Sequence, residues 1–287
     1  MQNVRTLPLA ASGEEPDLAH GSIYFIGTAT VLLRYAGFTV LTDPNFLHNG
    51  DKIHVGYGLQ GIRVTNPAIE LEDLPPIDLV LLSHMHEDHF DRLVEAKLEK
   101  TLPILTTPDA SRTLGKKGFS ATHPLTTWQS MTVTKGPVTL RVTAMPGQHA
   151  PDLLLPLFPP VMGSMLQFLA PSGKTTLYLY ITGDTLIHEH LKEIPQRYPE
   201  IDLALLHLGG TKLFGVMLTM DGRQGVEAIR LIRPKLSIPI HYNDYNVFRS
   251  PLDDFKKAVS EAGLEERVRY LSHGETYEFE VPQSRIV

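Results

Sequence analysis

Short apolar runs alternate along the chain with segments whose apolar residues recur at helical spacing. The runs predict β-strands over residues 22–26, 30–35, 37–42, 77–83, 138–145, 175–182, 201–206 and 235–240. The helical spacing predicts helices over residues 90–100, 186–196, 222–233 and 252–262. This mixture is typical of the α/β (α+β) class. Because no linker or low-complexity tract interrupts the pattern, we predict an N-terminal arm over residues 1–21 and a single domain over residues 22–287.

Several predicted strands run into a residue that can bind a metal ion. Asp43 and His241 directly follow their strands, and Asp184 and His149 come a few residues after theirs. In layered α/β proteins, sites lie where loops converge at the ends of strands. We therefore expect these side chains to meet although they are far apart in the sequence.

The densest cluster follows the apolar run 77–83. It reads Ser83-His84-Met85-His86-Glu87-Asp88-His89. His84 and His86 point the same way if strand geometry continues, whereas Glu87 points away from them. Imidazoles and a carboxylate are suitable ligands for divalent cations such as zinc. The cluster therefore predicts a metal site rather than a surface tract rich in histidine.

The spacing of these residues resembles that of a known superfamily. The order His84-X-His86-X-Asp88-His89, followed by His149, Asp184 and His241, resembles the metallo-β-lactamase superfamily. The segments 26–33, 41–44, 183–185 and 219–221 are similar to the branch of L-ascorbate-6-phosphate lactonase and the N-acyl phosphatidylethanolamine phospholipase D type of phosphodiesterase. The resemblance implies a four-layer αββα sandwich with a metal site along one edge. Thr28 stands where many relatives have histidine, so no substrate contact is transferred to that position.

The resemblance also implies a role for each ligand. His84, His86 and His149 would hold the first metal ion, and Asp88, His89 and His241 the second. Asp184 would bridge the two ions and accept a proton from the nucleophile, so Asp184 and Asp88 are the candidate catalytic carboxylates. Two divalent ions are implied, with zinc as the first choice and manganese or iron as alternatives. No organic cofactor is expected.

Four further residues are candidates for the surroundings of the metals. Asp43 is expected to accept the second ring N–H of a ligand histidine. Asp221 has two interpretations, because it either orients a ligand or caps the helix that follows it. His207 either lines the pocket or has a structural role, and Tyr242 is placed beside the pocket because it follows His241.

Two long loops adjoin the predicted ligands. The connection over residues 45–76 contains His48, His54 and Tyr57, which either reach the substrate or lie on the surface. The segment 150–163 is rich in proline and leucine and follows His149. It is either an apolar lid or pocket wall, or a loop that only covers the core.

Composition limits the class of protein. The 287 residues include no cysteine, which excludes disulfides, thiolate zinc sites and a cysteine nucleophile. A net charge of -6 does not suggest nucleic acid binding. No apolar run approaches the roughly 20 residues of a membrane span, and residues 1–21 make a poor signal peptide, so we expect a cytoplasmic protein with a small-molecule substrate. The sequence does not determine whether the protein forms a homo-oligomer.

These expectations combine into a metal-dependent hydrolase, in which a metal-activated hydroxide attacks a small ester, lactone or phosphodiester. A phosphorylated substrate requires nearby cations, for which Lys52, Arg63, Lys212, Arg223 and Arg249 are available in loops. The apolar residues of 153–158 favour a hydrophobic substrate instead. The alternative is a non-hydrolytic di-iron, redox or metal-binding member of the same fold, although no flavin domain is visible.

Overall fold

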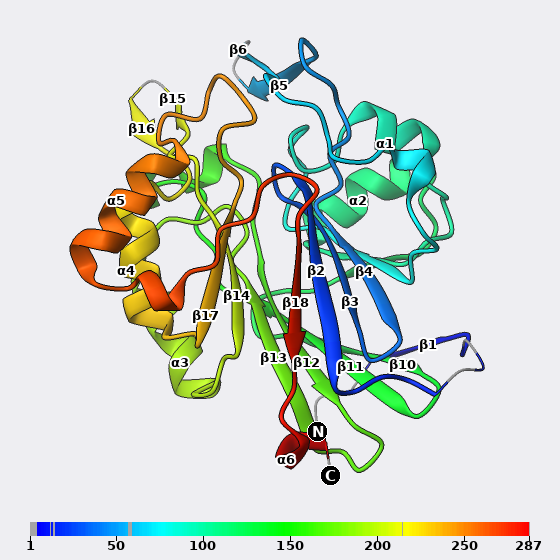
Figure 1. Cartoon of the computed structure of the whole chain (residues 1–287). Helices are drawn as coiled ribbons and strands as arrows, with labels where there is room; N and C mark the ends of the chain where they lie inside the picture. Colours follow the sequence, from blue (N-terminus) through cyan, green and yellow to red (C-terminus); the bar gives the residue numbers. More distant parts are fainter. Residues whose placement is uncertain (1–4, 12, 14, 57–58, 214, 287) are drawn as a thin grey trace.

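Two seven-stranded sheets pack face to face, with helices on their outer sides (Figure 1). The computed structural model describes residues 5–11, 13, 15–56, 59–213 and 215–286. This arrangement confirms the predicted αββα sandwich.

The first sheet has the strand order β18-β2-β3-β4-β7-β8-β9. Its strands are β2 (His20–Gly27), β3 (Thr30–Tyr35), β4 (Phe38–Thr42), β7 (Leu79–Leu81), β8 (Ile104–Thr106), β9 (Thr122–Pro124) and β18 (Thr276–Glu280). β2, β3 and β4 form an antiparallel meander, after which β4, β7, β8 and β9 run parallel. The outer face is covered by α1 (Arg92–Lys97) and α2 (Pro108–Lys116), with η1 (Leu71–Asp73) in the connection before β7.

The second sheet has the order β1-β10-β11-β12-β13-β14-β17. Its strands are β1 (Arg5–Leu9), β10 (Ser130–Lys135), β11 (Val138–Met145), β12 (Gly163–Leu169), β13 (Thr175–Ile181), β14 (Leu203–His207) and β17 (Leu236–Ile240). β13, β14 and β17 run parallel. The helical elements that follow or cover this sheet are η2 (Asp152–Leu157), η3 (Glu189–Lys192), α3 (Glu193–Arg197), α4 (Gly222–Ile232), α5 (Leu252–Ala262), η4 (Glu265–Arg267) and α6 (Gln283–Ile286).

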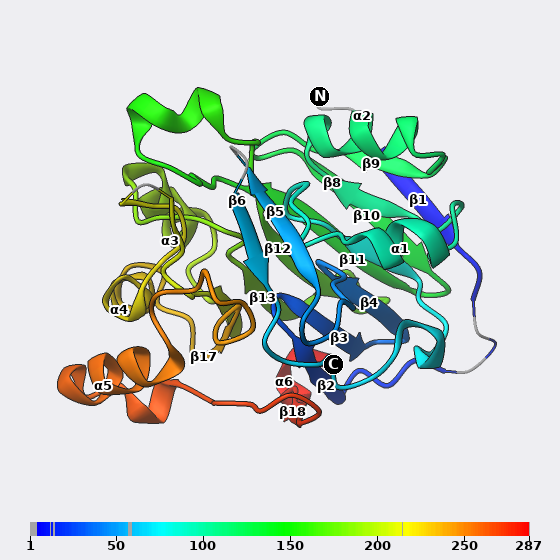
Figure 2. The ribbon, with the colours of Figure 1, turned by 90° about the horizontal axis from the view of Figure 1, so that it is seen from above.

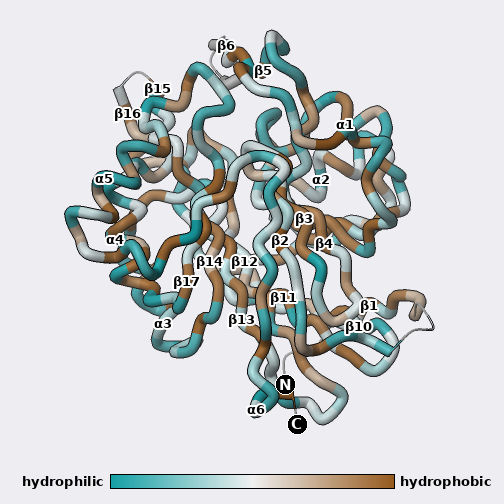
Figure 3. The backbone as a smooth tube through the Cα atoms, viewed as in Figure 1, coloured by the Kyte–Doolittle hydropathy of each residue, from teal (hydrophilic) through white to brown (hydrophobic). Residues whose placement is uncertain are grey.

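Apolar side chains fill the space between the sheets and beneath the helices. Phe25 and Leu33 of the first sheet belong to the same buried cluster as Leu140 and Leu179 of the second. Separate clusters join α1 and α2 to the first sheet and α3, α4 and α5 to the second. Figure 3 shows the hydrophobic strands enclosed between more polar outer elements. Burial of this apolar surface is the main force that holds the four layers together.

Both sheets direct the carboxyl ends of several strands to one edge. The chain leaves β4 and β7 there, and it also leaves β11, β13, β14 and β17. Two small hairpins lie at this edge, uppermost in Figure 1: β5 (Lys52–Gly56) with β6 (Leu59–Ile62), and β15 (Lys212–Leu213) with β16 (Val216–Met217). The predicted ligands therefore come from adjacent loops.

One prediction of local structure needs correction. Within the predicted arm over residues 1–21, β1 pairs in parallel with β10 of the second sheet. The division into an arm and a single domain over residues 22–287 stays a prediction. The helix expected over residues 186–196 begins only at Glu189, first as a 3-10 turn and then as α3.

The helices of the described residues are also too short or too polar to span a lipid bilayer.

Candidate metal centre

The loop after β7 carries four of the candidate ligands in a tight turn. The backbone N–H groups of His89 and Phe90 both donate to the carbonyl of His86. Asp91 then caps α1 by accepting hydrogen bonds from the N–H groups of Leu93 and Val94. Strand, turn and capped helix together fix the loop at both ends.

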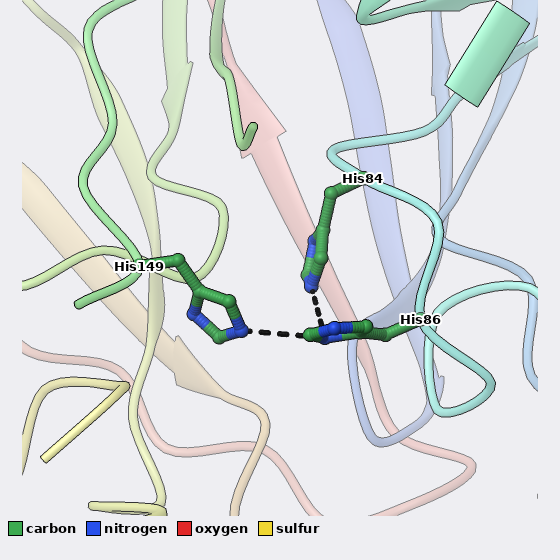
Figure 4. Close-up of side chains that lie close together, drawn as sticks. All are labelled: His84, His86 and His149. Atoms are coloured by element: carbon green, nitrogen blue, oxygen red, sulfur yellow. Dashed lines mark hydrogen bonds between the residues drawn. The ribbon is translucent and has the colours of Figure 1, made fainter. Parts of the chain in front are cut away.

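His84, His86 and His149 form a first group of imidazoles (Figure 4). Nε2 of His84 lies 2.9 Å from Nδ1 of His86, and Nε2 of His149 lies 3.2 Å from the same atom. His84 and His149 are buried, and His86 is half-buried. Three ring nitrogens thus point at one another from two distant segments of the chain.

Asp88, His89, Asp184 and His241 form a second group. Nε2 of His89 lies 3.1 Å from Oδ2 of Asp184, and Nε2 of His241 lies 3.4 Å from Oδ2 of Asp88. Nε2 of His84, from the first group, lies 4.0 Å from Oδ2 of Asp184. The carboxylate of Asp184 therefore lies between the two groups, as expected for a bridging ligand.

The chemistry of these groups fits divalent metal ions. Within each group the ligand atoms all lie within 4.8 Å of one another. Oδ1 of Asp184 is buried without a hydrogen-bond partner, which is costly unless a cation binds there. A set of imidazole nitrogens and carboxylate oxygens suits zinc, manganese or iron.

The first group is held in the neutral form that binds metal. Burial lowers the pKa of His84 and His149, and it lowers the pKa of His86 to about 3. Neighbouring histidines add to the effect for His84 and His86. A neutral imidazole has a lone pair available for a cation.

The second group behaves in the opposite way. Burial opposes the charged form of His89, but Asp184, Asp88 and Asp43 outweigh it and raise the pKa of His89 well above its ordinary value. Burial likewise opposes ionisation of Asp184, yet His241 and His89 hold the pKa of Asp184 well below its ordinary value. The second group thus has carboxylate charge that requires a nearby positive charge, which a metal ion supplies.

The ligand rings are oriented by groups behind them. Nδ1 of His149 donates to the carbonyl of Leu218 at 3.1 Å, and Nδ1 of His241 donates to the carbonyl of Leu208 at 3.0 Å. These bonds leave Nε2 of both rings free to face the centre. Asp43 has the geometry predicted for it, because its Oδ2 lies 3.2 Å from Nδ1 of His89.

The other three predicted neighbours have different surroundings. His207 is fully buried between Asp43, 3.3 Å from its Nε2, and Thr182. With Asp43 and His89 it forms a third group whose ligand atoms lie within 4.8 Å of one another, and its role stays a prediction. Asp221 is the N-cap of α4 and does not orient a ligand. The placement of Tyr242 is wrong, because its hydroxyl donates to the carbonyl of Leu271 within the core between the sheets.

A network centred on Asp244 was missed by the sequence reasoning. Asp244 is buried, and its Oδ2 accepts the backbone N–H of Thr28 at 2.8 Å. The carbonyl of Thr28 accepts the N–H of His241 at 2.6 Å. His273 pairs with Oδ1 of Asp244 at 3.2 Å. Thr28 and His241 both have positive φ, a strained conformation for residues other than glycine. Such strain clusters at functional sites, so it points to this network, which no sequence motif predicts.

Arg63 does not serve as a cation for a phosphorylated substrate. Its side chain is fully buried, lies over the ring of Tyr245 and donates from Nη1 to Oδ1 of Asn45. Among the loop histidines, the half-buried His48 pairs with Glu70, and the exposed His54 pairs with Glu87. Tyr57 lies outside the described residues.

The comparison with protein families agrees with this architecture. The family described as "Beta-lactamase superfamily domain" matches residues 39–242, a range that contains the ligand loop, His149, Asp184 and His241. The chain belongs to the β-lactamase superfamily domain family. The narrower branch of lactonases and phospholipases stays a prediction.

Relatives within the β-lactamase superfamily match nearly the whole chain. A protein of Archaeoglobus fulgidus named "UPF0173 metal-dependent hydrolase" is 29% identical over 261 residues, which cover 90% of this chain and 98% of that protein. The structure of a metallo hydrolase from Ignicoccus hospitalis matches with a TM-score of 0.65 at 25% identity, over 92% of this chain and all of that one. The structure of isothiocyanate hydrolase from Delia radicum gut bacteria has a TM-score of 0.77 at 20% identity, over 91% and 100% of the two chains, and shows a shared fold.

Proposed function

We propose that the protein is a metal-dependent hydrolase that cleaves a small ester, lactone or phosphodiester. The observation that carries the proposal is the position of the Asp184 carboxylate: Oδ2 lies 4.0 Å from Nε2 of His84 and 3.1 Å from Nε2 of His89, and Oδ1 is buried without a hydrogen-bond partner. The name of the relative from Archaeoglobus fulgidus, "UPF0173 metal-dependent hydrolase", supports it.

In this proposal seven residues hold two divalent ions. His84, His86 and His149 would hold one, Asp88, His89 and His241 would hold the other, and Asp184 would be shared between them. The ions supply Lewis acidity and lower the pKa of water toward neutrality. Zinc is our first choice, followed by manganese and iron.

The protein's own groups complete the reaction. Asp184 accepts the proton of the attacking water, because its carboxylate is ionised and has an oxygen without a hydrogen-bond partner. Asp88 is fixed near His241 and balances charge in the second group. Asp43 holds the ring of His89 from behind and thereby limits its rotation.

The test is a substrate screen of the protein loaded in turn with zinc, manganese or iron. Lactones, phosphodiesters and acyl esters would be compared, with bound metal measured in the same samples. We expect turnover of at least one class, and loss of turnover and of metal in His86→Gln. Oxygen consumption by the iron form in place of hydrolysis would contradict the proposal and favour redox chemistry.

A further inference from the structure

Each ligand group has a phenylalanine packed against it. The ring centroid of Phe158 lies 5.9 Å from that of His149, and the ring of Phe248 lies 4.5 Å from that of His241. Both phenylalanines are half-buried, whereas the two histidines are buried. The partly exposed apolar surface therefore begins directly beside the candidate ligands.

The segment that carries Phe158 is built to present apolar side chains. Leu154, Leu155 and Phe158 pack on a small buried cluster that includes Leu213 and Leu218 near the β15–β16 hairpin. The 3-10 helix η2 within this segment buries none of its residues. Figure 2 shows the segment projecting at the edge near β5 and β6. This packing fixes the segment with Phe158 beside His149.

The position of Phe248 depends on a glycine. A Cβ at Gly209 would lie 3.3 Å from Cγ of Phe248 and 2.6 Å from the carbonyl oxygen of His241. Gly209 also has a φ of 95°, which other residues rarely adopt. The close approach of Phe248 to His241 therefore requires a residue without a side chain at position 209.

The carboxylates of the ligand groups have histidines as their charged neighbours. Among the described residues, the ion pairs of Asp88 and Asp184 are all with histidines. Arg92, which begins α1 just after the ligand loop, is engaged by Asp51 and Glu87. The carboxylates of the ligand groups are thus balanced by imidazoles and not by lysine or arginine side chains.

Exposed hydrophobic side chains gather near the same edge. The large hydrophobic residues most exposed in the described chain are Leu153 (94%), Leu157 (59%), Val64 (46%) and Ile62 (38%). All four belong to the η2 segment or to the end of β6 and the residues after it. Such a concentration is typical of a surface that contacts an apolar ligand.

We infer that Phe158 and Phe248 form an apolar subsite that binds the uncharged hydrophobic part of the substrate, an acyl or alkyl chain. The inference rests on the proposed function, since it assigns the substrate class of the same centre. Burial of each methylene of such a chain strengthens binding by about fourfold.

The test compares two metal-binding probes that differ only in their apolar chain. Acetohydroxamate and octanohydroxamate would be titrated calorimetrically into the metal-loaded protein. We expect octanohydroxamate to bind at least about tenfold more tightly, because several methylenes are buried. Phe158→Ala and Phe248→Ala should reduce this ratio, and Phe→Leu at either position should restore most of it.

Tyr198→Ala serves as the matched control, because this half-buried aromatic residue packs on Tyr178 and not on a ligand histidine. An equal affinity for both hydroxamates, or an unchanged ratio in the double variant, would overturn the subsite. If esters are still hydrolysed in that case, the proposed function stands and only the subsite fails. Failure of the metal-loaded protein to bind either probe or to hydrolyse any ester would overturn both.

Discussion

Thr28 and Asp244 are joined by a 2.8 Å hydrogen bond from the backbone N–H of Thr28 to the buried carboxylate. Thr28 in turn accepts the N–H of His241, so Asp244 supports a candidate metal ligand through one intervening residue. The bonds hold Thr28 and His241 at positive φ, where few residues are stable without such support.

Replacing Asp244 should therefore weaken the second ligand group. We expect Asp244→Ala to lower the free energy of unfolding by about 1–3 kcal/mol, because the N–H of Thr28 loses its acceptor. Metal affinity at this group should fall about 10–100-fold, as for other changes behind a ligand. Asp244→Asn keeps an acceptor oxygen and is the control. Urea unfolding and metal titration measure the two effects, and wild-type affinity in Asp244→Ala would contradict the link.

Asp184→Asn should abolish hydrolysis without unfolding the protein. The amide retains the shape of the carboxylate but neither carries its charge nor accepts a proton. We expect kcat to fall about 10²–10⁴-fold, the usual range for loss of a general base. Steady-state kinetics, bound-metal analysis and circular dichroism provide the measurements. Turnover near that of the wild type in a folded variant would refute the assigned role.

Metal removal should reduce stability as well as activity. Without a cation, the ionised Asp88 and Asp184 rely on the imidazolium forms of His89 and His241 for charge balance. At a free metal concentration of about a thousand times Kd, binding adds about 4 kcal/mol to the stability of the folded state. Thermal melts with and without a chelator should show a higher Tm for the metal-loaded protein. Re-addition of zinc should restore it, and an unchanged Tm would argue against tight binding.

His188 should make stability dependent on pH. Burial lowers its pKa to about 4, with a further contribution from His190, and both of its ring nitrogens are buried without a hydrogen-bond partner. The unfolded chain, with an ordinary pKa near 6.5, takes up a proton first as the pH falls. The neutral form of His188 therefore contributes stability above about pH 6.5 that is lost as the pH falls through about 4.

The corresponding measurement is the free energy of unfolding between pH 7 and 4. His188→Gln should show a shallower decline than the wild type, with both proteins loaded with metal. His190→Gln removes only the contribution of the neighbouring histidine to the lowered pKa of His188, so its decline should lie between those of the wild type and His188→Gln. If His188→Gln and the wild type have equal slopes, burial does not lower the pKa of His188.

The sequence by itself determined the layered architecture and the residues that converge. Period-two apolar runs identified most strands of both sheets, because one face or both faces of each strand must be buried. The cluster from His84 to His89 identified the candidate metal centre, because so many imidazoles and carboxylates within six positions are typical of a metal site. Asp43 was also recognised, because its position directly after β4 is set by local sequence.

Only the tertiary structure decided what surrounds that centre. Tyr242 was expected beside the pocket, but the positive φ of His241 turns the chain and directs the tyrosine into the core. Arg63 was one of several loop cations available to a phosphorylated substrate, yet it is buried against Tyr245 and Asn45. The support of His241 by Asp244 joins the loops after β2 and β17, and no local pattern encodes such a long-range bond. Ligand identity follows from residue type and spacing, whereas side-chain burial and orientation depend on contacts between distant segments.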